Sequence, residues 1–257
     1  SDGSILSMNS NPTFDAQVFE DKKNIEINNL LNDESKPLFN RAFSGFYPPG
    51  SVFKPIPALL GLQNNLISEN TEIFCKGHSS LKDRNYYCWK KRGHGKVNLK
   101  KAIRESCDVY FYELAKKTDI NDLSALATNL GLNQKYELGL SNSQSGLVPN
   151  KKWKRAYLDE SWYQGETLIT CIGQGYNLTS PLQLANLYSA ILNGGKYPLP
   201  RINKESDIIY SGKSFNINYQ NILLESLMAV VQEPTGTAFK LNNLHPKYVK
   251  TVSYTHL

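Results

Sequence analysis

The clearest pattern of hydrophobic and polar positions lies in SPLQLANLYSAILNGG, residues 180–195. Apolar residues recur at positions 184, 187, 188 and 191, as on the buried face of an amphipathic helix. Ser180 is a favourable N-cap, Pro181 suits the first helical position, and Gly194 is a typical stop. The pattern therefore predicts a helix that begins after Ser180 and ends near Gly194.

Four other segments have helical signals, whereas strand-like segments lie towards the two ends of the chain. The further predicted helices are LKKAIRE (99–105, with Asn98 as N-cap), VYFYELAKK (109–117, after a break at 106–108), NDLSALATNLG (121–131) and NILLESLMAVVQ (221–232). The strand-like segments are 4–8, 208–210 and 247–254. Because no strand–helix–strand alternation is visible, we predict an α+β fold with the terminal strands in one sheet.

The segment YPPGSVFKPI, residues 47–56, has two interpretations. In the first, Ser51 is the N-cap of an apolar helix, Pro55 lies near its first turn, and Lys54 extends its amine to water. In the second, Ser51 is a nucleophile and Lys54 its base, because residues i and i+3 share a helix face. Apolar neighbours would favour a neutral amine that takes the serine proton. S-x-x-K is common by chance, so the pair alone does not decide.

Composition limits the class of protein without identifying a function. The chain has 257 residues, 40% hydrophobic and 20% charged, which suffices for one large domain or two small ones. No run approaches 18 apolar residues and the start has no signal-peptide pattern, so we predict no transmembrane helix. The first residues read as a strand in progress, which suggests a piece of a longer chain whose membrane anchor lies upstream. The charge of +6 is scattered apart from CWKKRGHGK, so we expect no nucleic-acid partner.

A second motif favours the nucleophile interpretation. Ser106-Cys107-Asp108 follows Ser51 by 55 residues, and S-x-x-K with a later S-x-N-type triplet is typical of penicillin-recognising serine enzymes. Longer blocks of the chain are more specific: NRAFSGFYPPGSVFKP, WKKRGHGKVNLKKAIRESCDVYFY, SGLVPNKKWK, WYQGET and IGQGYNLTSPLQLA. On these blocks the chain resembles the class B penicillin-binding proteins, and among them the elongation-type group, from residue 4 to about 249. Asp108 departs from the Asn of most of the superfamily but matches the elongation-type group.

The resemblance implies a penicillin-binding-protein and serine β-lactamase-like transpeptidase fold, with helices around an antiparallel sheet. It implies that Ser51 is the acylated nucleophile and Lys54 its general base. Ser106 would relay a proton to the leaving D-alanine, and Asp108 would hold Ser106 and Lys54 in place. The implied reaction is D,D-transpeptidation, in which Ser51 attacks the D-alanyl-D-alanine bond of one peptidoglycan stem peptide and an amine of a neighbouring strand resolves the acyl-enzyme.

The resemblance also implies partners and a location. The partners are peptidoglycan stem peptides, β-lactam antibiotics that mimic them, a SEDS-family glycan polymerase and proteins of the cell-elongation complex. The location is the periplasmic face of the bacterial inner membrane. Two alternatives stay open: a penicillin-recognising serine hydrolase, either a D,D-carboxypeptidase or a β-lactamase, and a non-catalytic β-lactam sensor or zinc-braced interaction module. The hydrolases share Ser51 and Lys54 but not the WKKRGHGKVNL and IGQGY blocks.

The third motif of the family, K-[ST]-G, is not present in its usual form. PTGTA at 234–238 has Pro234 in the lysine position and resembles a P-x-G-T-A segment that precedes the true motif in elongation-type relatives. After HPKYV (245–249) the chain reads Lys250-Thr251-Val252, with valine where glycine is needed.

We therefore interpret residues 1–249 as a transpeptidase domain that stops before the third-motif strand and the C-terminal helices. Residues 250–257 are interpreted as a non-native tail, so Lys250 and Thr251 are not assigned to the site. The alternative is a genuine strand over KYVKTVSY, whose alternation would support it.

Three of the four cysteines lie near one another in the sequence, with one histidine among them. These residues are Cys75, Cys88, His94 and Cys107, at spacings of 13, 6 and 13. From the residues alone, buried thiols, a disulfide between the first two cysteines and a zinc site all stay open, because the spacing fits no C-x-x-C finger. The resemblance implies zinc, since elongation-type relatives take zinc ligands from these four places. Three thiolates and one imidazole are a closed structural set, which would brace a subregion over 68–107. His78 is the competing histidine, and Cys171 stands apart.

Overall fold

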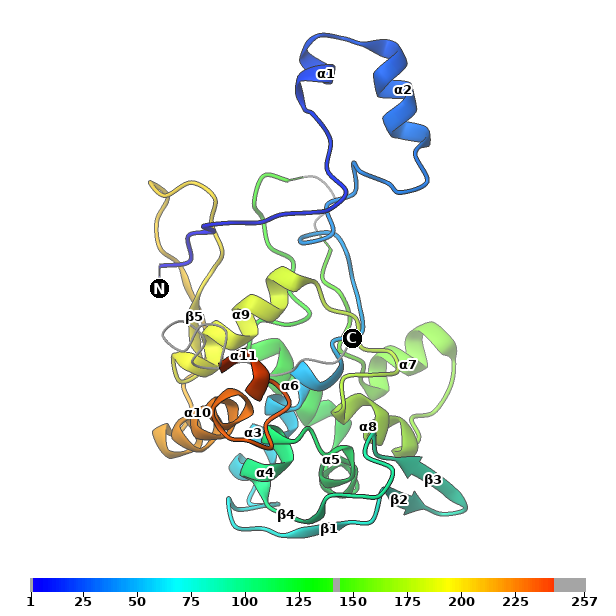
Figure 1. The fold of residues 1–257 in the computed structure, drawn as a ribbon, viewed down its shortest axis with the longest axis vertical. Helices are drawn as coiled ribbons and strands as arrows, with labels where there is room; N and C mark the ends of the chain where they lie inside the picture. Colours follow the sequence, from blue (N-terminus) through cyan, green and yellow to red (C-terminus); the bar gives the residue numbers. More distant parts are fainter. Residues whose placement is uncertain (1, 141–143, 243–257) are drawn as a thin grey trace.

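The computed structural model describes residues 2–140 and 144–242 of the chain. Its longer helices surround a buried central helix, and short two-stranded sheets lie at the periphery (Figure 1). The helices are α1 Gln17–Glu20, α2 Asn24–Asn32, α3 Pro55–Gln63, α4 Leu99–Arg104, α5 Asp108–Ala115, α6 Ile120–Asn129, α7 Lys151–Leu158, α8 Gln164–Cys171, α9 Pro181–Leu192, α10 Ile217–Gln232 and α11 Phe239–Asn242, together with a 3₁₀ turn, η1 Gly50–Phe53. The strands are β1 Ile73–Cys75, β2 His78–Leu81, β3 Arg84–Tyr87, β4 Gly95–Val97, β5 Lys196–Pro198 and β6 Tyr210–Gly212.

All five predicted helices are confirmed, as α4, α5, α6, α9 and α10. The caps explain two of their boundaries. Asn98 accepts a hydrogen bond from the backbone N–H of Lys101, and Ser180 accepts one from the backbone N–H of Gln183, which returns its own side chain in a capping box. The predicted break at 106–108 is also present, because α4 ends at Arg104 and α5 begins at Asp108.

The prediction of one sheet from the terminal strands is wrong for the two segments that can be compared. Segment 4–8 forms only a single parallel bridge, Ser4 to Arg201, and Leu6 is exposed, because no continuous neighbouring strand runs beside it. Segment 208–210 contributes only its last residue to β6, which pairs antiparallel with β5. The third segment, 247–254, lies outside the described residues.

The sequence patterns also miss two antiparallel pairs. Strand β1 pairs with β4, and β2 pairs with β3 in a tight hairpin. Both pairs lie at the end of the molecule opposite to α1 and α2, which project away from the helical body (Figure 1). The described part therefore contains three separate two-stranded sheets.

The core is built around α3, whose residues from Pro55 to Leu62 are all buried. Helices α5, α6 and α10 pack against it, so this helix is enclosed on several sides. The helix begins at Pro55 with proline in its first turn, as expected, but its N-cap is Lys54 and not Ser51. Ser51 lies one turn earlier, in η1, and the N-cap interpretation of this serine is wrong.

A close backbone contact fixes the segment that carries Ser51. The Gly50 N–H donates to the Gly173 carbonyl at 2.8 Å, which joins the PPGS turn to the loop after α8. A Cβ atom at Gly173 would lie 2.1 Å from the Gly50 carbonyl oxygen, so only glycine permits this approach.

Among the described residues, none of the helices has the length and apolar content needed to cross a lipid bilayer.

Candidate active site

The structure brings all four predicted catalytic residues together. The Ser106 hydroxyl donates to Ser51 Oγ at 2.9 Å, and Lys54 Nζ lies 2.9 Å from Ser106 Oγ. Lys54 Nζ also donates to Asp108 Oδ1 at 2.8 Å, which forms an ion pair. We refer to Ser51, Lys54, Ser106 and Asp108 as the hydroxyl–amine cluster.

The contact between Lys54 and Ser51 is indirect, which the i, i+3 argument did not anticipate. In the described part of the chain, Lys54 Nζ has hydrogen bonds to the Ser106 carbonyl, the Ser106 hydroxyl and Asp108. The amine therefore reaches the Ser51 hydroxyl through Ser106. The Lys54 amine is directed towards the Ser106–Asp108 segment, because all three of these acceptors lie there.

Lys54 is held in a buried, fully bonded position. Its side chain is 2% exposed, and its ammonium lies 5.5 Å from the centre of the Phe111 ring on α5. A buried charge requires a partner and satisfied hydrogen bonds, and Asp108 with the Ser106 oxygens meets this need. The predicted role of Asp108 in holding Lys54 thus has a geometric basis.

Backbone strain and a tryptophan shape the segment that carries Ser106. Ser106 has a φ of 52°, a left-handed conformation that is uncommon for serine and directs its hydroxyl towards Ser51. Trp89 supports this turn, because its indole N–H donates to the Ser106 carbonyl at 3.0 Å and its backbone N–H donates to Asp108 Oδ2 at 3.0 Å. Trp89 and Phe111 were not predicted, and no spacing rule in the sequence identifies them.

A cavity of about 380 Å³ opens onto Ser51. Its walls come from the PPGS turn, Trp89, the Ser106–Asp108 segment, and Ile172 and Gln174 from the loop after α8. Ser51 and Ser106 therefore line the same space. This arrangement suits the binding of a substrate that both hydroxyls contact.

The three cysteines and the histidine of the predicted metal site are also brought together. Their ligand atoms lie within 4.8 Å of one another, and all four residues are buried; we call Cys75, Cys88, His94 and Cys107 the thiol cluster. His94 Nδ1 lies 3.5 Å from Cys75 Sγ and 3.6 Å from Cys88 Sγ. A tetrahedral zinc ion with Zn–S of about 2.3 Å and Zn–N of about 2.0 Å places such atoms about 3.5 Å apart. The donor set and its spacing fit zinc.

The chemistry of the thiols agrees with this fit. A hydrogen bond with the Cys107 thiol lowers the pKa of Cys88 to about 3, against the opposing effect of burial. The same hydrogen bond, together with burial, raises the pKa of Cys107 above its usual range. Both shifts arise because the Cys88 and Cys107 sulfur atoms are in hydrogen-bond contact. All four cysteines are free thiols, including the proposed disulfide pair.

The two residues set apart in the sequence analysis lie elsewhere. His78 pairs with Tyr87 in the β2–β3 hairpin and does not belong to the thiol cluster. Cys171 is fully buried at the end of α8, and burial raises its pKa. The structure thus favours His94 over His78 as the histidine of the cluster.

The PTGTA segment, 234–238, lies beside the same region. The Thr237 N–H donates to the Arg104 carbonyl at the end of α4, and Arg104 forms ion pairs with Glu105 and Glu233. Lys100 also pairs with Glu233, at 2.7 Å. A second cavity, of about 360 Å³, is lined by residues of this segment together with Trp89 and His94. Lys250, Thr251 and Val252 lie outside the described residues, so the third-motif prediction stays a prediction.

Comparison with known proteins now identifies the family. Residues 1–251 match the penicillin binding protein transpeptidase domain, and the chain belongs to this family. The peptidoglycan D,D-transpeptidase MrdA of Salmonella typhimurium is 32% identical over 271 residues, which cover 99% of this chain and 43% of MrdA. The expected fold class is confirmed by the solved relatives.

Two of these relatives are PBP2 structures. Pseudomonas aeruginosa PBP2, solved in complex with WCK 5153, has a TM-score of 0.84 and 33% identity, covering 93% of this chain and 55% of that one. Helicobacter pylori PBP2, solved in complex with MreC, has a TM-score of 0.83 and 34% identity, covering 91% of this chain and 44% of that one. The chain spans about half the length, or less, of these relatives.

Proposed function

We propose that this chain provides the catalytic site of a peptidoglycan D,D-transpeptidase, with Ser51 as the acylated nucleophile. One observation carries the proposal: an unbroken path of hydrogen bonds joins Ser51 Oγ to Lys54 Nζ through Ser106 Oγ, with 2.9 Å at each step. Membership of the transpeptidase family and the likeness to MrdA support it.

The path accounts for acylation. Ser51 Oγ attacks the carbonyl carbon between the two D-alanines, and the serine proton leaves through Ser106 towards the Lys54 amine, which acts as a base once it has released the extra proton of its ion pair with Asp108. A hydroxyl hydrogen rotates about its C–O bond, so Ser106 can accept from Ser51 and donate onward. The C–N bond then breaks, and Ser106 returns the proton to the departing D-alanine nitrogen. The product is an ester between Ser51 and the shortened stem peptide.

Transfer reverses the proton movement. The amine of a second strand attacks the ester carbonyl, the C–O bond to Ser51 breaks, and a new amide forms. The proton lost by that amine returns through Ser106 to Ser51 Oγ. Asp108 keeps its contact with Lys54 during both steps, which holds the amine near Ser106.

The thiol cluster is proposed to hold one structural zinc ion through Cys75, Cys88, His94 and Cys107. Zinc would supply a closed four-ligand centre and no open position for a substrate. Cys107 lies between Ser106 and Asp108, so a bound ion would fix the segment that carries two residues of the hydroxyl–amine cluster.

Partners and location follow from the relatives and the resemblance. We propose that the whole protein acts at the periplasmic face of the bacterial inner membrane, on peptidoglycan stem peptides, and is acylated by β-lactams. The complex of Helicobacter pylori PBP2 with MreC supports a contact with a protein of the elongation complex. A SEDS-family glycan polymerase is proposed from the family resemblance.

Labelling with a fluorescent penicillin tests the proposal. In a chain completed through the third motif, we expect a covalent adduct on the peptide that contains Ser51, identified by mass spectrometry, with a lifetime of many minutes; residues 1–257 alone should label poorly or not at all. We also expect the acyl group of a D-alanyl-D-alanine peptide to be transferred to an added D-amino acid. Rapid loss of the penicillin adduct would indicate a β-lactamase, and a stable adduct without amine transfer would indicate a sensor.

A further inference from the structure

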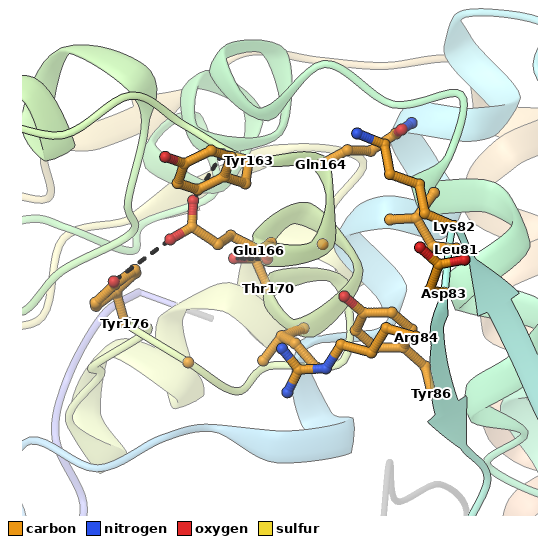
Figure 2. A pocket seen from close by; sticks show the side chains of 13 residues that line it. Leu81, Lys82, Asp83, Arg84, Tyr86, Tyr163, Gln164, Glu166, Thr170 and Tyr176 are labelled. Carbon is orange, nitrogen blue, oxygen red and sulfur yellow. Dashed lines mark hydrogen bonds between the residues drawn. The ribbon is translucent and has the colours of Figure 1, made fainter.

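The largest cavity described in the structure is not the one that opens onto Ser51. It has a volume of about 800 Å³ and lies between the β2–β3 hairpin and α8 (Figure 2). Its walls include the turn 81–84, the rings of Tyr86, Tyr163 and Tyr176, and the face of α8 that carries Thr170. A cavity of this size accommodates several residues of an extended peptide.

This cavity adjoins the Ser51 cavity across one short loop. Ile172 and Gln174 line the cavity at Ser51, whereas Gly175 and Tyr176, the next residues along the chain, line the larger one. A ligand in the larger cavity would therefore be separated from the Ser51 cavity by the loop 172–176. That position suits a second substrate.

The hairpin wall of the cavity carries a positive charge that has no ion-pair partner among the described residues. Arg84 is exposed, its guanidinium lies 5.6 Å from the centre of the Tyr86 ring, and it projects across the cavity (Figure 2). Within the ranges that the structure describes, it has no ion pair with a carboxylate. Lys82 and Asp83 lie in the same turn and offset one another in charge, so the hairpin turn keeps a net charge of +1.

The acidic residue on the opposite wall does not neutralise this charge. Glu166 accepts a hydrogen bond from the buried Lys154 at 2.5 Å and another from the Tyr163 backbone N–H at 2.8 Å. Lys154 also pairs with Glu160 at 3.1 Å. These bonds hold Glu166 on its own side, and they fix the start of α8 in place.

The cavity is formed before any ligand binds. A Cβ atom at Gly165 would lie 2.2 Å from the Tyr86 hydroxyl, so the hairpin and α8 are already in close contact. The two walls therefore meet at their base and stay apart above it. Little reorganisation is needed for binding, which favours affinity.

We propose that this cavity binds the carboxylate-bearing stem peptide of the acceptor strand, with Arg84 as its anion-binding residue. A neutral saccharide would leave the guanidinium without a partner, whereas a carboxylate forms two parallel hydrogen bonds with it. The tyrosine rings pack against the aliphatic parts of the peptide. The assignment of the bound peptide as an acceptor rests on the proposed transpeptidase function.

Isothermal titration on the full chain carrying Ser51→Ala tests the proposal. The probe is the tetrapeptide L-Ala-γ-D-Glu-L-Lys-D-Ala, which lacks the terminal dipeptide of a donor and cannot acylate the protein. We expect saturable binding that Arg84→Gln weakens about tenfold, as for the loss of a hydrogen bond to a charged group. Arg84→Lys should lie between the two, because it keeps the charge but loses the planar fork.

Two controls make the result specific. Arg155→Gln removes an exposed arginine, 69% exposed, on α7 outside the cavity and should leave the affinity unchanged. A probe in which both the glutamyl α-carboxyl and the C-terminal carboxyl are amidated should bind the parent chain about as weakly as the unmodified probe binds Arg84→Gln. Thermal melting of each variant checks that the fold is intact.

Three results would overturn the proposal: no binding, equal affinity of both probes, or equal affinity of the parent chain and Arg84→Gln. Tight binding of neutral chitotriose in place of the peptide would identify a glycan site. The proposed function is tested separately by penicillin labelling of Ser51 in a chain completed through the third motif. If labelling fails while the tetrapeptide binds through Arg84, the cavity is a peptide site and the transpeptidase assignment is lost.

Discussion

The hydroxyl–amine cluster and the thiol cluster are neighbours with opposite designs. In the hydroxyl–amine cluster, the charges of Lys54 and Asp108 balance and the Lys54 amine finds three acceptors within the protein. In the thiol cluster, four ligand atoms crowd around one point, and the buried His94 Nε2 has no hydrogen-bond partner among the described residues. The first cluster is held by contacts between side chains and backbone alone, whereas the second has the donor set of a metal centre. Side-chain substitution should therefore be the sharpest test of the first, and metal removal that of the second.

The largest effect is expected from Ser51→Ala. This change removes the nucleophile, so covalent labelling by fluorescent penicillin should disappear. The hydroxyl takes one hydrogen bond from Ser106, so the free energy of unfolding should fall by only about 1 kcal/mol. Gel fluorescence and thermal melting measure the two quantities. Labelling that persists in this variant would place the nucleophile elsewhere.

Lys54→Met should affect both chemistry and stability. Acylation should slow by orders of magnitude, because an unactivated serine hydroxyl is a poor nucleophile. Asp108, 13% exposed, would lose its partner, and the free energy of unfolding should fall by roughly 3–5 kcal/mol. Stopped-flow acylation and urea unfolding measure these effects. As a control, adding Asp108→Asn to Lys54→Met should recover part of the stability but none of the acylation rate.

Removal of the metal should disturb the thiol cluster directly and the hydroxyl–amine cluster indirectly, through Cys107. We expect about one zinc per chain by elemental analysis, with three thiols protected until a chelator is added. Cys107→Ser should lower the melting temperature and slow acylation, whereas Cys171→Ser should change little. A chain that contains no metal, is two daltons lighter than the reduced form and loses stability with reductant would support a Cys75–Cys88 disulfide instead.

The two histidines provide a matched pair. His94→Ala removes an atom 3.5 Å from Cys75 Sγ and should lower both zinc content and melting temperature. His78→Ala changes a partly exposed residue of the β2–β3 hairpin and should leave both unchanged. The comparison uses the same substitution at two nearby sites, measured by elemental analysis and thermal melting. The zinc assignment fails if the two variants behave alike.

The smallest effect is expected at Glu233, which links the PTGTA segment to α4. Hydrogen bonds from Lys100 and then Arg104 lower the pKa of Glu233 below its usual 4.5. A lowered pKa means that the ion pairs stabilise the fold above pH 4.5 and are lost as pH falls through the folded-state value. Glu233→Gln should therefore cost at most about 1 kcal/mol at neutral pH, with the difference vanishing in acid. Urea unfolding at several pH values measures this difference in the free energy of unfolding. A difference that grows in acid would contradict the prediction.

The sequence predicted those parts of the fold that local signals control. Helix α9 has a cap, a proline and a stop glycine in register, and its bounds match the prediction. Helix α7, KKWKRAYL, was missed because its buried residue is Lys154, a residue type that usually indicates an exposed position. Only Glu160 and Glu166, brought close by the tertiary fold, make that burial favourable.

The same limit applies to the candidate site. The spacing of Ser51 and Lys54 and the Ser106–Asp108 triplet were visible in the chain, and their convergence was expected from the family resemblance. The indirect path through Ser106 was not visible, because it depends on the tertiary contacts of Lys54 with the Ser106–Asp108 segment and on the positive φ of Ser106. Trp89 was likewise missed as a support, since its partners, the Ser106 carbonyl and the Asp108 carboxylate, lie 17 and 19 residues further along the chain.

The alternation of Ser106, Cys107 and Asp108 has a consequence for how this protein can vary. Consecutive side chains serve the two clusters in turn, with no spare residue between them. Inserting or deleting one residue here would present a thiol to Ser51 and a hydroxyl to the cysteines. Chain length in this segment is therefore under tighter constraint than residue type, and its evolutionary change must proceed by substitution alone.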